Sequence, residues 1–220
     1  TMPSATRNYA AAIDALNSLQ SNSATIESIR RSGKTVNELN EPEMTEYLQR
    51  IGHRRDELDR LNVIHITGTK GKGSTAAFCD ALLQKARPPG AGKIGLYTSP
   101  HMVAARERIR IDGVPISEAD FAKFFWEVWD RLEQNPHRAL ETTPLRPVYF
   151  RFMTILAFHV FISLEVSATL LEVGIGGMYD STNIVQHPVV TGVTALGLDH
   201  TAILGHTLEE VAWQKAGIFK

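Results

Sequence analysis

The sequence predicts an α/β fold in which a mostly parallel β-sheet is flanked by helices. Short apolar runs, each long enough for one buried strand, alternate with longer segments whose apolar residues recur every three or four positions. A glycine-rich loop joins the first of these strands to a helix, and polar residues directly follow several other strands. Strands that are apolar throughout are typical of a parallel sheet that helices cover on both faces.

The first sixty residues predict a helical segment that packs on this core. Apolar residues lie at helical spacing over residues 9–19 and 44–51, and Gly52 would end the second helix. The polar stretch between them, residues 21–40, predicts a loop.

The remaining elements follow from the same periodicities. Buried strands are predicted at residues 63–67, 94–97, 169–173 and 189–196, and a half-exposed strand at 106–111. Helices are predicted at residues 75–86, after a capping box at 117–120, at 150–164, and after a second capping box at 207–210. Residues 134–149 contain three prolines and predict a loop.

The composition is that of an ordinary globular domain. Of the 220 residues, 43% are hydrophobic and 21% charged, and the formal net charge of −1 gives no general attraction to nucleic acid or membrane surfaces. A single cysteine excludes an intrachain disulfide framework. No apolar run reaches the length of a membrane span, and the first twelve residues lack the apolar core of a secretion signal.

The loop at residues 68–74, Gly-Thr-Lys-Gly-Lys-Gly-Ser, predicts a phosphate-binding site. Backbone N–H groups and the positive end of a helix dipole meet an anion at such a strand–loop–helix junction, and a lysine adds a full charge. A plain connecting turn would not need three glycines and two lysines. The predicted nucleotide-binding residues are Gly68, Thr69, Lys70, Gly71, Lys72, Gly73 and Ser74.

Four polar clusters follow predicted strands, at residues 68–74, 98–99, 172–177 and 199–200. Ligands of open α/β sheets bind beyond the carboxyl ends of the strands. We therefore expect these clusters to meet at one edge of the sheet. Nucleoside triphosphates are bound with Mg²⁺, which prefers oxygen ligands.

Three side chains are candidates for the metal. Ser74 offers a hydroxyl, Glu172 a carboxylate at the end of an apolar strand, and His200 an imidazole beside the same edge. A buried carboxylate needs a metal or a cation partner, so the alternative for Glu172 is a salt bridge to Lys72 or an arginine. The alternative for His200 is a purely structural role.

Lys215 falls on the apolar stripe of the last predicted helix. Its stem could carry the ammonium outward to solvent, or the ammonium could pair with Asp199 or Glu172. A third reading is covalent, because a neutral lysine amine can take up CO₂ as a carbamate, an anionic oxygen donor that positions magnesium.

Five stretches together resemble the folylpolyglutamate synthase and dihydrofolate synthase family, a branch of the Mur-ligase superfamily. They are the loop at 68–74, Tyr-Thr-Ser-Pro-His-Met at 97–102, Arg-Glu-Arg-Ile-Arg-Ile at 106–111, Glu-Val-Gly-Ile-Gly-Gly at 172–177, and Leu-Asp-His-Thr at 198–201 with Lys-Ala-Gly-Ile at 215–218. The resemblance runs from about residue 7 to residue 220. It implies a nucleotide domain of the P-loop type, like the central domain of Mur ligases.

The resemblance implies an ATP-dependent ligase that adds L-glutamate to the γ-carboxylate of tetrahydrofolate through an acyl phosphate. It implies ATP and Mg²⁺, and allows a monovalent cation such as K⁺. Lys72 would meet the terminal phosphates. The hydroxyl of Thr98, where the family often has serine, would bind magnesium with Glu172 and His200. Lys215 would be carbamylated, which makes Lys72, Lys215 and His200 the catalytic candidates. The implied substrate residues are Ser99, Pro100, His101, Arg106, Arg110, Tyr149 and Phe150.

Family members are longer than this chain. We expect residues 61–220 to form an incomplete nucleotide domain without the C-terminal glutamate-ligase domain, and to show little or no ligase activity alone. A dihydrofolate synthase, a bifunctional enzyme, a non-catalytic nucleotide- or folate-binding fragment and a P-loop kinase remain alternatives. We expect a cytoplasmic monomer, with a mitochondrial form as the alternative location, whose partners are folate and L-glutamate rather than nucleic acid.

Overall fold

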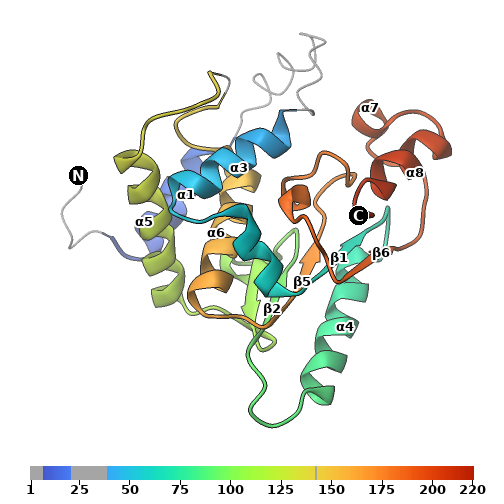
Figure 1. Ribbon diagram of the computed structural model, residues 1–220, viewed down its shortest axis with the longest axis horizontal. Helices are drawn as coiled ribbons and strands as arrows, with labels where there is room; N and C mark the ends of the chain where they lie inside the picture. Colours follow the sequence, from blue (N-terminus) through green and yellow to red (C-terminus); the bar gives the residue numbers. More distant parts are fainter. Residues whose placement is uncertain (1–6, 21–38, 142) are drawn as a thin grey trace.

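A six-stranded sheet forms the centre of the computed structural model, which describes residues 7–20, 39–141 and 143–220 (Figure 1). The strand order is β4-β3-β2-β5-β1-β6. β1, β2, β5 and β6 run parallel, whereas β3 and β4 are antiparallel at one edge. The prediction of a mostly parallel sheet is confirmed. The strands are β1 (Val63–Thr67), β2 (Ile94–Tyr97), β3 (Ile109–Ile111), β4 (Val114–Pro115), β5 (Ala168–Glu172) and β6 (Val190–Val193).

Helices lie on both sides of the sheet. α1, α3, α5 and α6 gather on one face, α4 lies on the other, and α7 and α8 lie beside the ends of β1 and β6 (Figure 1). Their bounds are α1 (Tyr9–Ser18), α3 (Asn40–Arg50), α4 (Lys72–Ala86), α5 (Glu118–Gln134), α6 (Tyr149–Ser163), α7 (Thr201–Leu204) and α8 (Leu208–Ala216). The 3₁₀ turns are η2 (Arg55–Leu61), η3 (Ala105–Arg108) and η4 (Ser181–Ile184). Most of the loop predicted at residues 21–40 lies outside the described residues.

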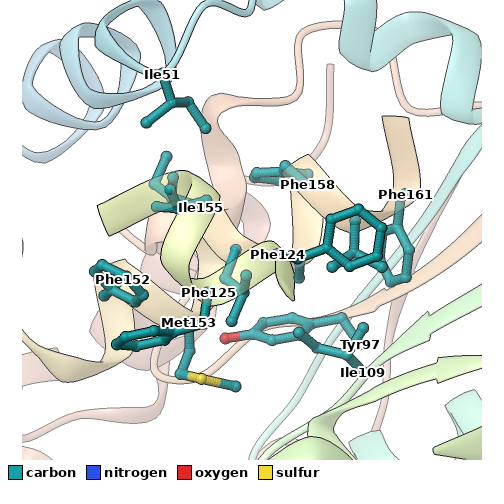
Figure 2. Close-up of a cluster of buried hydrophobic side chains, with 14 of the residues drawn as sticks. Ile51, Tyr97, Ile109, Phe124, Phe125, Phe152, Met153, Ile155, Phe158 and Phe161 are labelled. Atoms are coloured by element: carbon teal, nitrogen blue, oxygen red, sulfur yellow. The ribbon is translucent and has the colours of Figure 1, made fainter. Parts of the chain in front are cut away.

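The main core fills the space between the sheet and α5 and α6. Tyr97 and Ile109 of the sheet face Phe125 of α5 and Phe152 of α6, and all four are fully buried (Figure 2). The rings of Phe125 and Phe152 lie 5.0 Å apart. Truncating one of these rings to alanine would cost about 3–5 kcal/mol of stability. α1 and α3 bury residues in the same cluster; a domain division at residue 60 stays a prediction.

The opposite face of the sheet has a much smaller core. Ile66, Leu96 and Leu170 pack there against Ala76 of α4. The sequence predicted a buried strand at 189–196, and β6 contradicts this within the described residues. Val190 pairs with Ile64 of β1, yet its side chain is 55% exposed because no described helix covers that end of the sheet.

Three predicted boundaries are wrong for local reasons. α4 begins at Lys72 rather than residue 75, because Gly71 takes a left-handed φ of 88° and acts as the N-cap. The strand predicted at 106–111 begins only at Ile109, because the Glu107 carboxylate accepts three successive backbone N–H groups and holds the chain in η3. β6 ends at Val193, three residues before the predicted end. In the part of the chain that the structure describes, no helix is both long and apolar enough to cross a membrane.

A chain of titratable groups is buried beside this core. His53 Nε2 and His159 Nδ1 are hydrogen-bonded at 2.8 Å, and His159 Nε2 lies 2.8 Å from a carboxylate oxygen of Glu127. Burial lowers the pKa of His159 to about 4, with further lowering by His53 and Arg131 and an opposing effect of Glu127. Burial also lowers the pKa of His53, against the carboxylate of Glu57. Both imidazoles are therefore neutral at pH 7.

We expect this pair to make stability depend on pH. An unfolded histidine binds a proton below about pH 6.5, whereas folded His159 does so only near pH 4. Its contribution is therefore complete above pH 6.5 and is lost as pH falls toward 4. At pH 5 the loss from His159 alone is about 2 kcal/mol. Urea unfolding at pH 7.5 and pH 5 measures it. In His159→Gln the free energy of unfolding should fall by about 2 kcal/mol less between pH 7.5 and pH 5 than in wild type. The control is His187→Gln, which changes an exposed histidine and should behave as wild type. An equal loss of stability in wild type and both variants would contradict the assignment.

Candidate functional site

One large cleft opens at the carboxyl ends of the parallel strands. Its volume is about 680 Å³. All four polar clusters singled out in the sequence contribute to its wall. The lining residues are Asn40, Thr69, Lys72, Ser99, Pro100, Arg108, Val148, Phe150, Arg151, Gly174, Ile175, Tyr179, Asp180, Ser181, Asp199, His200, Ile203, Leu204 and Gln214. Segments from eight parts of the sequence thus meet in one place, as ligand sites of open α/β sheets do.

The phosphate loop forms one end of this cleft. Lys72 is the first residue of α4, and its Nζ donates to the carbonyl oxygen of Gly68 across the loop at 3.0 Å. Its ammonium therefore lies over the loop, where the free N–H groups of the helix terminus point. Ser74 is exposed, in the first turn of α4, and does not line the cleft. The predicted loop is in place, but its serine does not face the cavity.

Glu172 lies at the end of β5, beneath the cleft wall and 3% exposed. Its Oε2 accepts the backbone N–H of Ser99 at 2.9 Å, and a Cβ at Gly73 would lie 3.4 Å from both carboxylate oxygens. Burial raises its pKa, while the Ser99 N–H and then the positive charges of Lys72 and Arg108 oppose this. No salt bridge to Glu172 occurs among the described residues, so the structure does not support the ion pair considered as its alternative role.

This carboxylate fits a hard cation. It lies against the phosphate loop, and the Ser99 N–H is the one hydrogen bond that it accepts within the described residues, so an oxygen remains for a metal. Residues 7–20, 39–141 and 143–220 contain no cluster of three His, Cys, Asp or Glu side chains able to hold a metal. A Mg²⁺ ion there would need water or phosphate oxygens as further ligands, which is how Mg²⁺ is commonly bound.

The residue after β2 that contacts Glu172 is Ser99 rather than Thr98. Thr98 does not line the cleft, and its backbone N–H donates to the carbonyl oxygen of Arg108 at 3.0 Å. Ser99 lines the cleft and contacts Glu172 directly. Strand pairing continues one residue past Tyr97, which holds Thr98 at the sheet edge and presents Ser99 instead. Ser99 rather than Thr98 thus lines the cleft beside the carboxylate, and it contacts Glu172 through its backbone N–H.

The segment 106–111 also contributes a different arginine to the cleft wall from the two predicted, Arg106 and Arg110. Arg106 donates to the carbonyl oxygen of Ile116, and Arg110 to that of Glu107, and neither lines the cleft. Arg108 does line it, because η3 turns the chain before β3 begins. A regular strand over 106–111 would have placed all three arginines on one face, so the alternation alone could not single out Arg108.

Arg108 is held by two other predicted substrate residues. Its Nε donates to His101 Nδ1 at 2.9 Å, and its guanidinium lies 5.5 Å from the centre of the Tyr149 ring. Burial first and then Arg108 lower the pKa of His101, which keeps that imidazole an acceptor. His101 and Tyr149 therefore support the wall, whereas Phe150 forms part of it.

Asp180 is the site residue that sequence reasoning missed most clearly. Its carboxylate accepts the backbone N–H groups of Gly174 and Ile175 at 3.1 Å and both the N–H and the hydroxyl of Thr182. Burial raises its pKa, and these four hydrogen bonds oppose the rise. Asp180 thus shapes the glycine-rich loop that follows β5. The sequence signal that could have identified Asp180 is its position three residues after the pair Gly176-Gly177.

Lys215 is 3% exposed in α8 and does not line the cleft, although the neighbouring Gln214 does. Burial and then the charge of Lys72 lower its pKa to about 8, against the carboxylate of Asp199. Among the described residues no salt bridge holds its ammonium. The sequence therefore located a buried lysine correctly, and the structure places it on the helix next to the glycine-rich loop.

The glycine-rich loop and α8 approach each other so closely that only glycine fits at the contact. A Cβ at Gly177 would lie 2.8 Å from the carbonyl oxygens of Gln214 and Lys215. Met178 N–H donates to the Gln214 carbonyl oxygen at 2.7 Å. The position of Lys215 therefore depends on this backbone contact.

Gly177→Ala should accordingly displace α8 and destabilise the protein by about 1–3 kcal/mol, the usual cost of forcing a methyl group into packed structure. Gly192→Ala on β6 is the matched control, because a Cβ there would meet nothing within 4 Å. Urea unfolding of both variants tests this. Equal stability of the two variants would show that the loop does not pack against α8 as described.

The chain resembles known proteins over nearly its whole length. No protein-family model matches the chain. A "Probable folylpolyglutamate synthase" of Schizosaccharomyces pombe is 50% identical over 219 residues, which are 98% of this chain and 43% of that protein. A "Folylpolyglutamate synthase" of Saccharomyces cerevisiae (strain YJM789) is 51% identical over 97% of this chain and 40% of its own length. The solved "FPGS-AMPPCP-folate complex" is 31% identical, with a TM-score of 0.74 over 97% of this chain and 46% of that one. The chain thus spans less than half the length of these relatives.

Proposed function

Because the chain belongs to the folylpolyglutamate synthase family, we propose that it is the ATP-binding part of a ligase that adds L-glutamate to the γ-carboxylate of tetrahydrofolate. The observation that carries this proposal is the single cleft in which a phosphate loop, a buried carboxylate and an arginine-bearing wall meet. The relative solved with AMPPCP, an ATP analogue, and folate supports it.

In the proposed reaction a folate carboxylate oxygen attacks the γ-phosphorus of ATP, and ADP leaves. The amine of L-glutamate then attacks the acyl phosphate carbon, loses a proton, and phosphate leaves. A carboxylate is a poor electrophile, so conversion to the mixed anhydride supplies a leaving group. The protein's task is to position the reactants and stabilise charge.

The phosphate end of the cleft has the groups for this. N–H groups of residues 70–73 would hold the triphosphate, and Lys72 would meet its terminal phosphates. Glu172, the hydroxyl of Ser99 and His200 would hold Mg²⁺. The bound ion would neutralise charge that develops on the phosphoryl oxygens.

The other end of the cleft suits an aromatic acid. Phe150 offers a ring face and Arg108 a guanidinium whose orientation is set by His101 and Tyr149. A guanidinium binds a carboxylate with two parallel hydrogen bonds. Arg151 adds a second guanidinium, paired with the carboxylate of Glu43. We assign the folate acid to this end.

Glutamate incorporation tests the proposal. This chain and a longer chain that extends past Lys220 to the length of the relatives should be assayed with ATP, Mg²⁺, labelled glutamate and either tetrahydrofolate or dihydropteroate. We expect incorporation by the longer chain with tetrahydrofolate, and little or none by the 220 residues alone. Incorporation only with dihydropteroate would establish the dihydrofolate synthase alternative, and no incorporation with either acceptor would overturn the ligase assignment.

The chemical state of Lys215 is part of the same proposal. Its pKa of about 8 leaves a fraction of neutral amine at pH 7.5, the form that takes up CO₂. We therefore propose a carbamate at Lys215. Lys215→Ala should lower the activity of the longer chain, and small carboxylates such as acetate should partly restore it. An unmodified amine in high-resolution density, or no rescue, would contradict the carbamate.

We further propose that the protein is a cytoplasmic monomer, as the family resemblance implied. Sedimentation equilibrium at micromolar concentration and cell fractionation test these two statements. A stable dimer or a mitochondrial pool would correct them.

A further inference from the structure

The phosphate loop is joined to the segment that follows β6. Thr69 N–H donates to the Ala195 carbonyl oxygen at 2.9 Å, and Lys70 and Ala195 form an isolated antiparallel bridge. From the other side, Thr194 Oγ1 donates to the Lys70 carbonyl oxygen at 2.7 Å. The side chain of Thr194 packs directly on Gly68, where a Cβ would lie 1.7 Å from Thr194 Oγ1. The loop and residues 194–197 therefore form one hydrogen-bonded unit.

The Thr69 hydroxyl completes this unit. Its Oγ1 donates to the Gly197 carbonyl oxygen at 2.9 Å and accepts the Gly197 N–H at 3.1 Å. One side chain thus satisfies both backbone groups of a residue 128 positions away. Both interactions are internal to the protein, so this hydroxyl is not a free ligand for phosphate. The sequence had assigned Thr69 simply to nucleotide binding.

The far end of this segment leads into α7, where the His200 carbonyl oxygen accepts the N–H groups of Ile203 and Leu204 at 2.8 and 3.0 Å, and few apolar contacts are buried before it. Leu196 is 44% and Leu198 60% exposed, and Asp199 and His200 are exposed as well. Apolar burial therefore does not fix residues 196–200, and the hydrogen bonds to Thr69 are what tie them to the loop. Asp199 and His200 nevertheless line the cleft, two and three residues after Gly197.

We propose that Thr69 is a positioning residue whose hydroxyl sets the place of Asp199 and His200 relative to the phosphate loop. The inference rests on the proposed function for its consequence, since His200 is a proposed metal ligand there. Loss of the hydroxyl would release Gly197 and let His200 move away from the bound nucleotide, while the N–H groups of the loop remain.

The first test needs no ligand. Amide exchange of the 220-residue chain is compared for wild type, Thr69→Val, which keeps the shape but lacks the hydroxyl, and Thr69→Ser, which keeps the hydroxyl. We expect Gly197 to exchange at least about tenfold faster in Thr69→Val and at the wild-type rate in Thr69→Ser. Thr169→Val is the matched control, a buried threonine of β5 whose hydroxyl has no hydrogen-bond partner among the described residues. Unchanged exchange at Gly197 in Thr69→Val overturns the proposal.

The second test measures AMPPCP affinity with and without Mg²⁺. Thr69→Val should weaken binding about 5–100-fold with Mg²⁺ and much less without it, and Thr69→Ser should restore it. His200→Ala should add little in the Thr69→Val background, because both changes remove the same group from the site. Equal losses of AMPPCP affinity in Thr69→Val and Thr69→Ser would contradict positioning through His200, as would additive losses when His200→Ala is combined with Thr69→Val.

If wild type binds no AMPPCP, the proposed function fails, while the exchange test still decides the role of Thr69. Should Thr69→Val not fold, Thr69→Ala takes its place.

Discussion

Lys72→Ala should weaken binding of AMPPCP to this chain about 10–100-fold, the cost of losing a charge-assisted hydrogen bond to a phosphate. Lys72 starts α4 and reaches back over the loop to the Gly68 carbonyl oxygen, so its ammonium faces the place where the terminal phosphates would lie. Isothermal titration measures the loss. The fold should persist, because alanine is a good residue in the first turn of a helix and the buried Glu172 carboxylate, although it loses the nearby charge of Lys72, keeps its hydrogen bond from Ser99.

The control for this variant is Lys85→Ala. Lys85 belongs to the last turn of the same helix and is exposed, far along α4 from the loop. The Lys85→Ala substitution removes one positive charge from the same helix without changing the cleft. Equal losses in the two variants would mean that only the net charge of the protein attracts the nucleotide, and the phosphate loop would not be the binding site.

Glu172→Gln should raise the Mg²⁺ concentration needed for half-maximal AMPPCP binding by at least about tenfold. The amide has the shape of the carboxylate and can still accept the Ser99 N–H, but it lacks the negative charge that Mg²⁺ prefers in a ligand. Titration of Mg²⁺ at fixed AMPPCP separates this effect from nucleotide affinity, which should change little when the metal saturates.

Asp80→Asn is the matched control for Glu172→Gln. Asp80 is a buried carboxylate of α4 that accepts a hydrogen bond from Gln84 outside the cleft. Its change should leave the Mg²⁺ requirement as it is in wild type. A normal requirement in Glu172→Gln would remove Glu172 from the metal site and leave it a structural acceptor for Ser99.

The elements of this fold were predictable because their signals are local. The strands at 63–67 and 94–97 have the predicted bounds, and the helix at 150–164 is displaced by a single residue. Each depends on an apolar run or a helical periodicity that no distant contact overrides. The antiparallel edge of β3 and β4 was not predicted, because pairing direction depends on partners distant in the sequence.

The location of the site was predictable from the sequence, but the identity of each residue that lines it was less so. The rule that strand ends share an edge gathered the phosphate loop, Glu172 and His200 into one region. Which neighbour faces the cavity is decided by shifts of one or two residues, and these separated Ser99 from Thr98 and Arg108 from Arg106 and Arg110. The arginine shift arises from η3, whose capping carboxylate of Glu107 accepts three N–H groups at once. The Ser99 shift arises from the hydrogen bond between Thr98 N–H and the Arg108 carbonyl oxygen, which extends the strand pairing by one residue.

The most direct test of the central claim is a crystal structure of this chain with AMPPCP and Mn²⁺, which replaces Mg²⁺ and is visible by anomalous scattering. We expect the triphosphate over the N–H groups of residues 70–73, with the anomalous peak between its terminal phosphates and the Glu172 carboxylate. A nucleotide bound at another surface, or a metal peak out of contact with Glu172, would contradict the account.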